Sequence, residues 1–120
     1  MRAVLTGLAL FAPLAFAAPA MAQNGDRTAS AAIEQGDYAG AERTLLQELR
    51  IHPGRPELLL NLATVYARTG REAEAKALYR QVLAQNDVKM DLSADRVAGS
   101  HAVAMAGLRR ISDVRTASNR

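Results

Sequence analysis

An all-α fold of antiparallel helix-turn-helix repeats, an α-solenoid, is predicted for this 120-residue chain by three observations. Gly36 and Gly70 stand 34 residues apart, and the residues that follow them run in parallel over 37–42 and 71–76. Apolar residues recur at helical spacing on both sides of each glycine. Gly and Pro separate the apolar segments. A repeat of this length with a helical period indicates stacked helix pairs.

The N-terminus is predicted to be a cleaved signal peptide of the Sec type, residues 1–22. One basic residue precedes an apolar run over 3–17, and small residues at Ala20 and Ala22 fit cleavage after Ala22. The alternative is a membrane anchor, but the run contains a proline and is shorter than the roughly 20 apolar residues of a spanning helix. We therefore expect a periplasmic or secreted chain over 23–120, with no stable membrane span after cleavage.

Composition excludes several classes of function. The chain has no cysteine, so disulfides, a lipoprotein anchor, thiol catalysis and Cys-based zinc sites are all excluded. The net charge of +3 falls to +2 when Arg2 leaves with the signal peptide. The longest basic run is Arg109-Arg110, and aromatic residues are few, so no nucleic-acid partner is expected.

The first predicted helix pair lies on either side of Gly36. A short helix over 26–35 ends at this glycine, which can adopt the left-handed conformation common after helices. Asp37 can cap the second helix, over 38–51, because its side chain can accept a hydrogen bond from the first turn. A turn over 52–56 follows. The apolar face of the second helix is Tyr38, Ala41, Leu45, Leu46 and Leu49.

The second predicted pair lies on either side of Gly70. Pro56 suits the first position of a helix over 56–69, since its missing N–H would be unpaired there anyway. A fourth helix over 72–84 has Glu72 and Glu74 in its first turn, where the helix dipole favours acidic residues. The inward face of the third helix is Leu59, Leu62, Ala63 and Tyr66, and that of the fourth is Ala75, Leu78, Tyr79, Val82 and Leu83.

The helical pattern lapses after Gln85. The segment over 88–92 alternates apolar and polar residues, but a single strand without a partner predicts extended chain instead. Ser100 can cap a final helix over 101–112, and residues 116–120 are expected to be frayed.

Seven residues of the second pair agree in kind with the tetratricopeptide repeat pattern, which asks in order for a bulky residue, Leu, a small residue, Tyr, Gly, Ala and an aromatic residue. They are Leu59, Leu62, Ala63, Tyr66, Gly70, Ala75 and Tyr79. Val82 and Asp87 depart from the pattern, which has a small residue and Pro there. The chain thus resembles a small exported bacterial member of the tetratricopeptide repeat (TPR) family over about residues 25–87, strongly in the second copy and in part in the first.

This resemblance implies a module that holds another protein or peptide on the concave surface formed by its first helices. The implied partner-binding residues are Glu57, Leu60, Asn61, Thr64 and Arg68, with Ala67 at a further groove position. Leu60 and Thr64 depart from the residues that grip a terminal carboxylate, so no carboxylate clamp is expected. Leu60 is expected either to seat a partner's apolar side chain or to contact the chain's own C-terminal helix.

The number of repeats raises the question of what covers the ends. About three repeats are normally needed for independent stability, and residues 23–87 hold fewer than two full ones. The cover can come from the C-terminal region over 88–120, from self-association or from a partner. We favour the first, with residues 88–112 as a cap. Its expected contacts are Val88, Met90, Leu92, Leu108 and Ile111.

The function expected from these residues is that of an exported adaptor that binds an envelope or periplasmic protein. The alternative is a structural or self-associating subunit of a secretion, pilus or envelope assembly. An enzyme is not expected, because the only histidines, His52 and His101, lack the neighbours that a metal site or a hydrolytic triad needs. No catalytic, cofactor-binding or metal-binding residue is therefore assigned, and no cofactor is expected.

Overall fold

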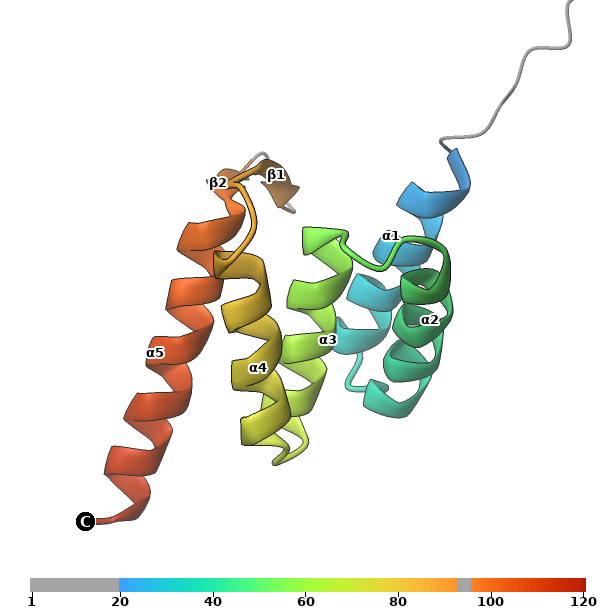
Figure 1. Cartoon of the computed structure of the whole chain (residues 1–120). Helices are drawn as coiled ribbons and strands as arrows, with labels where there is room; N and C mark the ends of the chain where they lie inside the picture. Colours follow the sequence, from blue (N-terminus) through green and yellow to red (C-terminus); the bar gives the residue numbers. More distant parts are fainter. Residues whose placement is uncertain (1–19, 93–95) are drawn as a thin grey trace, which may run out of the picture.

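The structure is a computed structural model that describes residues 20–92 and 96–120. In these residues it has helices α1 (Ala20–Glu34), α2 (Tyr38–Ile51), α3 (Pro56–Arg68), α4 (Glu72–Leu83) and α5 (Ser100–Ser118), with strands β1 (Lys89–Leu92) and β2 (Arg96–Gly99) before α5 (Figure 1). Most of the expected signal peptide, residues 1–19, lies outside the described residues. Its cleavage therefore stays a prediction.

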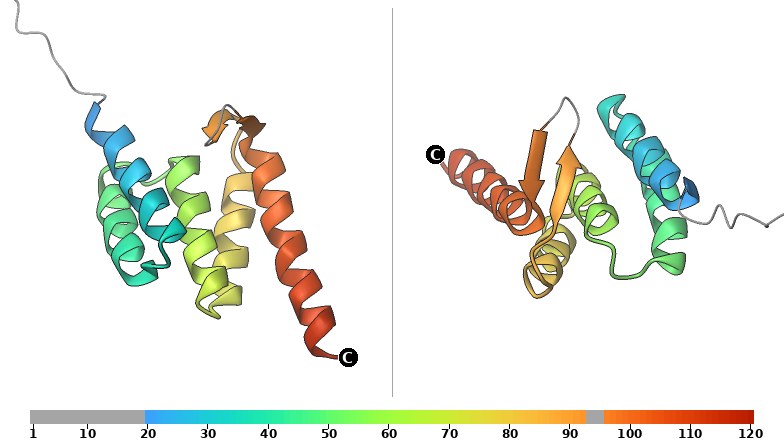
Figure 2. Two further views of the ribbon diagram at one scale, coloured as in Figure 1. Left: turned by 180° about the vertical axis from the view of Figure 1, so that it is seen from behind. Right: turned by 90° about the horizontal axis from the view of Figure 1, so that it is seen from above.

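The helices form two rows. Each helix packs on the next along the chain, and α3 also contacts α1 and α5. Seen from above, α1, α3 and α5 make one row, and α2 and α4 make the other (Figure 2). This arrangement confirms the predicted TPR-like helical repeats.

Short-range signals place the helix ends as expected. Gly36 and Gly70 adopt left-handed conformations with φ of +77° and +79°, and the Asp37 carboxylate accepts a hydrogen bond of 3.0 Å from the Gly40 N–H. Pro56 occupies the start of α3. The outer helices are longer than predicted, because α1 begins at Ala20 and α5 continues to Ser118.

The segment after α4 differs from the prediction of unpaired extended chain, which is wrong. β1 pairs antiparallel with β2, so that Met90 lies opposite Ala98 and Leu92 lies opposite Arg96. The alternation noticed over 88–92 is a real strand period, since Met90 is buried while Lys89 and Asp91 on either side are exposed. The partner strand was missed because Arg96–Gly99 is short and contains one strongly strand-forming residue, Val97.

Ser100 does not cap α5, so that prediction is also wrong. The cap residue is Gly99, and Ser100 is fully buried. The Ser100 hydroxyl donates to Asp87 over 3.2 Å and accepts from the Val88 N–H over 3.0 Å. Asp87 accepts the His101 N–H over 3.0 Å, and this bond holds the pKa of the Asp87 carboxyl below its usual value. Asp87, where the repeat pattern has Pro, thus satisfies a backbone N–H of the helix end from 14 residues away.

The C-terminal region covers the second helix pair, as expected. Ala104 and Ile111 are buried in the core, and Met90 of the hairpin is buried with them. α5 approaches α4 closely at Gly107, where an added Cβ would lie 2.3 Å from Tyr79 Cζ. Of the expected cap contacts Leu92 and Leu108 are half-buried against this core, whereas Val88 is 42% exposed and contributes little to the cover.

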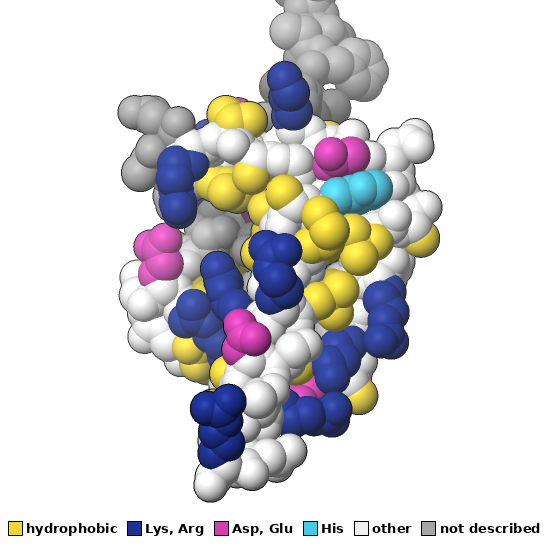
Figure 3. Space-filling model, turned by 90° about the vertical axis from the view of Figure 1, so that its left-hand side faces the viewer, with side chains coloured by type: hydrophobic (Ala, Val, Ile, Leu, Met, Phe, Trp, Pro, Cys, Tyr) yellow, Lys and Arg dark blue, Asp and Glu magenta, His cyan; other side chains and the backbone are white. Residues whose placement is uncertain are grey.

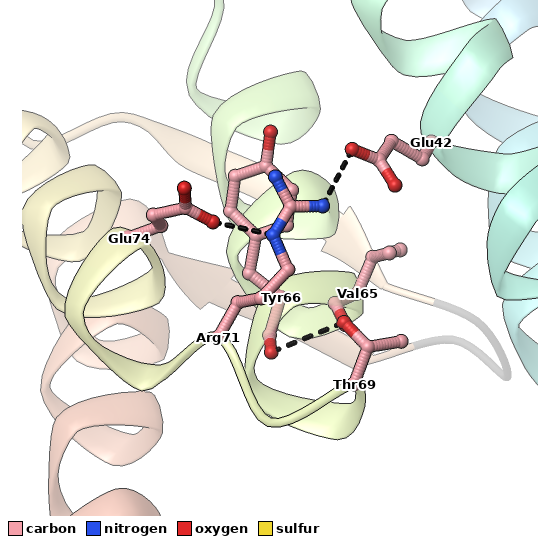
Figure 4. A network of polar contacts seen from close by, with 6 residues as sticks. All are labelled: Glu42, Val65, Tyr66, Thr69, Arg71 and Glu74. Atoms are coloured by element: carbon pink, nitrogen blue, oxygen red, sulfur yellow. Dashed lines mark hydrogen bonds and ion pairs between the residues drawn. The ribbon is translucent and has the colours of Figure 1, made fainter.

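Arg71 joins the two helix pairs at the turn after Gly70 (Figure 4). Its guanidinium donates to Glu42 of α2 over 2.7 Å and also to Glu74 of α4. The same group lies over the Tyr66 ring, 3.9 Å from the ring centroid. Nearby, the Thr69 hydroxyl donates to the Val65 carbonyl over 2.8 Å and closes the end of α3.

Candidate partner-binding groove

A groove of about 560 Å³ runs over the row formed by α1, α3 and α5 and is bounded on one side by the hairpin. In the view from behind, these three helices and the hairpin face the viewer (Figure 2). The residues that line the groove are Asp26, Arg27, Ser30, Ala31, Ile33 and Glu34 of α1, Glu57, Leu60, Asn61 and Thr64 of α3, Met90, Asp91, Leu92 and Arg96 of the hairpin, and Val103 of α5.

Apolar side chains form the floor of the groove. Leu60, Met90 and Ile33 are buried, and Leu92 and Val103 pack half-buried against the same core. The Leu60 side chain is 4% exposed. Its surface is therefore covered mainly by the chain itself, which favours the second of the two roles expected for this residue.

A hydrogen-bond network joins α1 to α3 at the side of the groove. The Asn61 amide nitrogen donates to Asp26 over 2.6 Å and to Ser30 over 3.1 Å. Burial raises the pKa of the Asp26 carboxyl, the bond from Asn61 acts against that rise, and the charge of Glu57 adds to it. Because its amide nitrogen already serves Asp26 and Ser30, Asn61 acts within the chain to set the spacing of two groove helices.

The predicted site residues divide between two places. Glu57, Leu60, Asn61 and Thr64 line the groove together. Arg68 does not join them: it lines a separate hollow of about 180 Å³ between α3, α4 and α5, which Thr64 also borders. Arg68 donates to the Tyr38 hydroxyl of α2 over 3.4 Å. Ala67, the further groove position, lies beside Arg68 in that smaller hollow.

Residues of the first copy complete the groove, and the sequence carried a signal for them. Moving the six expected positions in α3 back by one period of 34 residues reaches six residues of α1, and five of these line the groove. They are Asp26, Arg27, Ser30, Ile33 and Glu34. The weak match of the first helix to the pattern concealed this correspondence. The hairpin wall has no counterpart in the repeat and could not be found in this way.

Two other kinds of site receive no support within residues 20–92 and 96–120. No group of three or more His, Asp or Glu side chains there is placed to hold a metal ion. The His101 ring nitrogen Nε2 lies 2.7 Å from the Gln85 carbonyl oxygen, a contact that helps to tie α5 to the end of α4. None of the described helices has both the length and the apolar character that crossing a membrane requires.

Comparison with known proteins gives one match. A family model described as "Tetratricopeptide repeat" matches residues 32–89, which include the whole of α2, α3 and α4. Comparisons with curated proteins and with solved structures find no significant match.

Proposed function

Because this chain is a tetratricopeptide repeat protein over residues 32–89, we propose that it is an exported adaptor that binds an envelope or periplasmic protein through the groove. Repeats of this family are in general protein-interaction modules and typically have no catalytic activity. The single observation that carries the proposal is the groove itself, to which α1, α3 and α5 all contribute. A concave surface with an apolar floor and polar sides is the usual form of a binding site.

The cover supplied by the chain also supports this role. α5 and the hairpin already bury the second helix pair. The groove can therefore serve a partner without being required for folding.

The self-associating alternative finds less support in the charges at the two ends. The hollow between α1 and α2 at one end is lined by Arg43 and Arg50, with Asp37 as its one acidic residue. At the other end, Lys and Arg side chains gather over the lower part of α5 (Figure 3). Arg109, Arg110 and Arg115 of α5 are all exposed. Stacking one end on the other would bring like charges together, which is unfavourable.

Photo-crosslinking in cells that produce the full chain tests the adaptor role. A crosslinking amino acid is placed at Ala31, an exposed groove residue of α1, and in a control at Gln81, an exposed residue of α4 outside the groove. We expect a protein adduct of defined mass from Ala31 and none from Gln81. Equal adducts from both positions, or none from Ala31, would rule out the groove as the binding surface.

Two further measurements test export and the alternative. The mature protein recovered from the periplasm or the medium is expected to begin at Gln23, which its intact mass decides. Sedimentation of that protein at micromolar concentration is expected to give a monomer. A discrete oligomer would favour the structural-subunit alternative.

A further inference from the structure

The charge of the groove is opposite to that of the chain as a whole. The chain carries a net charge of +3. The groove is lined by four carboxylates against two guanidinium groups: Asp26, Glu34, Glu57 and Asp91 against Arg27 and Arg96. A local excess of negative charge in a positive protein selects for a cationic partner.

Two of these carboxylates are available to a partner. Glu57 is paired with Arg55 over 3.4 Å, and Asp26 accepts from Asn61. Glu34 and Asp91 are exposed, and neither makes an ion pair within the described residues. They come from different parts of the groove, since Glu34 is the last residue of α1 and Asp91 lies on β1. Cationic side chains from one bound segment could therefore be held at both places.

The edge of β1 borders the groove. Met90, Asp91 and Leu92 all line it, although successive residues of a strand point to opposite faces. Because residues from both faces of β1 line the groove, the groove must run along the edge of this strand. β1 lies on the side of the hairpin nearer α1, with β2 beside α5 (Figure 2). Within the described residues the sheet has only these two strands, so the backbone groups on the other edge of β1 have no strand to pair with.

Resting on the adaptor role, we propose that the groove takes an extended segment of the protein partner that carries Lys or Arg on either side of apolar residues and pairs its backbone with β1 as a third strand. Backbone hydrogen bonds to β1 would supply affinity, as in other cases of strand addition. The apolar side chains would reach the floor at Leu92 and Val103, which are only half-buried. The cationic side chains would lie against Glu34 and Asp91, which sets the sign of the preferred charge.

The charge preference is tested with two synthetic probes and the full mature chain. One probe has two lysines on each side of a Leu-Val-Leu centre, and the other has glutamates in place of the lysines. We expect the lysine probe to bind, with an affinity that falls as salt rises, and the glutamate probe not to bind. Asp91→Lys should weaken the lysine probe on the order of tenfold. Asp113→Lys, the same change at an exposed residue of α5 outside the groove, should have no effect.

Backbone pairing is tested with two N-methylated lysine probes, one methylated at the odd and one at the even amides. A strand at an edge points alternate N–H groups toward its neighbour, so one pattern should abolish binding and the other should be tolerated. Tolerance of both patterns would overturn the strand addition. Equal binding of lysine and glutamate probes, or no effect of Asp91→Lys, would overturn the charge preference.

Failure of this inference is distinguishable from failure of the adaptor role. If no probe binds while crosslinking from Ala31 still yields its adduct, the inference is wrong and the adaptor role stands. If that adduct is also absent, the adaptor role fails as well.

Discussion

The two helix pairs share one sequence pattern but differ in how they are covered. Residues one period apart are buried alike where the helices of a pair face each other: Ala29 matches Ala63, and Ala41 matches Ala75, all fully buried. The outward surfaces differ. α2 leaves Leu46 and Ile51 exposed by 43% and 68%. The repeat pattern therefore determines packing within a pair, and the neighbours on either side determine the rest.

The second pair has neighbours on both sides, which explains its larger core. α3 contacts helices on each side and buries Leu58, Leu60 and Val65 in addition to its predicted inward face. α1 and α2 end in a hollow of about 640 Å³ lined by polar residues, among them Arg43 and Arg50, and by the partly exposed Leu46. The first pair thus ends in an exposed surface that mixes polar and apolar residues, whereas the second depends on the cap.

Removing the cap is expected to have the largest effect. Truncation after Gln85 would expose the sides of α3 and α4 that Met90, Ala104 and Ile111 now cover. We expect loss of cooperative unfolding, measured by circular dichroism during heating, because the remaining residues form fewer than the three repeats usually needed. A monomeric fragment with an unchanged melting temperature would contradict the dependence on the cap.

A Leu→Asp change should lower the free energy of unfolding much more in the second pair than in the first. Leu60→Asp puts a carboxylate at a site that is 4% exposed, and we expect a loss of more than about 3 kcal/mol in the free energy of unfolding. Leu46→Asp makes the same change at a residue that is 43% exposed, where the expected loss is below about 1 kcal/mol. Urea unfolding of both variants measures the difference, and similar losses would refute it.

The contact between α4 and the cap can be weakened by one methyl group. Gly107→Ala would place a Cβ 2.3 Å from Tyr79 Cζ, and we expect a loss of about 1–3 kcal/mol from overpacking. Gly54→Ala is the matched control, since the nearest atom to its Cβ would be Gln85 Nε2 at 3.7 Å. Thermal unfolding should separate the two variants. If the cap did not contact α4 in solution, the two variants would have equal melting temperatures.

Lowering the pH should change the free energy of unfolding in opposite directions through Asp26 in the first pair and Asp87 in the cap. Burial raises the pKa of Asp26 in the first pair, so its folded state binds a proton more tightly and its contribution to stability falls as pH rises above about 4. The His101 N–H lowers the pKa of Asp87 in the cap, so its contribution is present at neutral pH and is lost as pH falls below about 4.

Comparing stability between about pH 3 and pH 7 for Asp26→Asn and Asp87→Asn checks both signs. The first variant should lose less stability on going to neutral pH than the parent chain. The second should lose less on going to acid pH, and should be the less stable of the two at pH 7. The same pH profile for both variants would show that neither carboxylate acts as described.

The helix pairs were predictable because their ends depend on near neighbours. The residues that set these ends each act within one turn of the chain, so their effect can be predicted from the local sequence. They are Gly36, Asp37, Pro56 and Gly70. The start of α5 was not predictable in this way, since Asp87 accepts the His101 N–H there from 14 residues away. Ser100 was a reasonable candidate by type, but its hydroxyl is engaged in the core instead.

The candidate site was predictable in part for the same reason. The repeat pattern placed Glu57, Leu60, Asn61 and Thr64 in one groove, while Arg68 faces a different hollow because α5 packs beside it. The residues from α1 follow from the period, as their match to α3 shows. The hairpin side of the groove could not be predicted from the local sequence, because Arg96–Gly99 becomes a strand only by pairing with β1.

By itself the sequence determined the two helix pairs, their turns and the family to which residues 32–89 belong. The tertiary structure alone decided which end of the array is covered, how deeply Leu60 is buried, and that a strand edge borders the groove. The reason is physical: helix ends and turns depend on the hydrogen bonds and backbone preferences of adjacent residues, whereas burial depends on segments that only folding brings together.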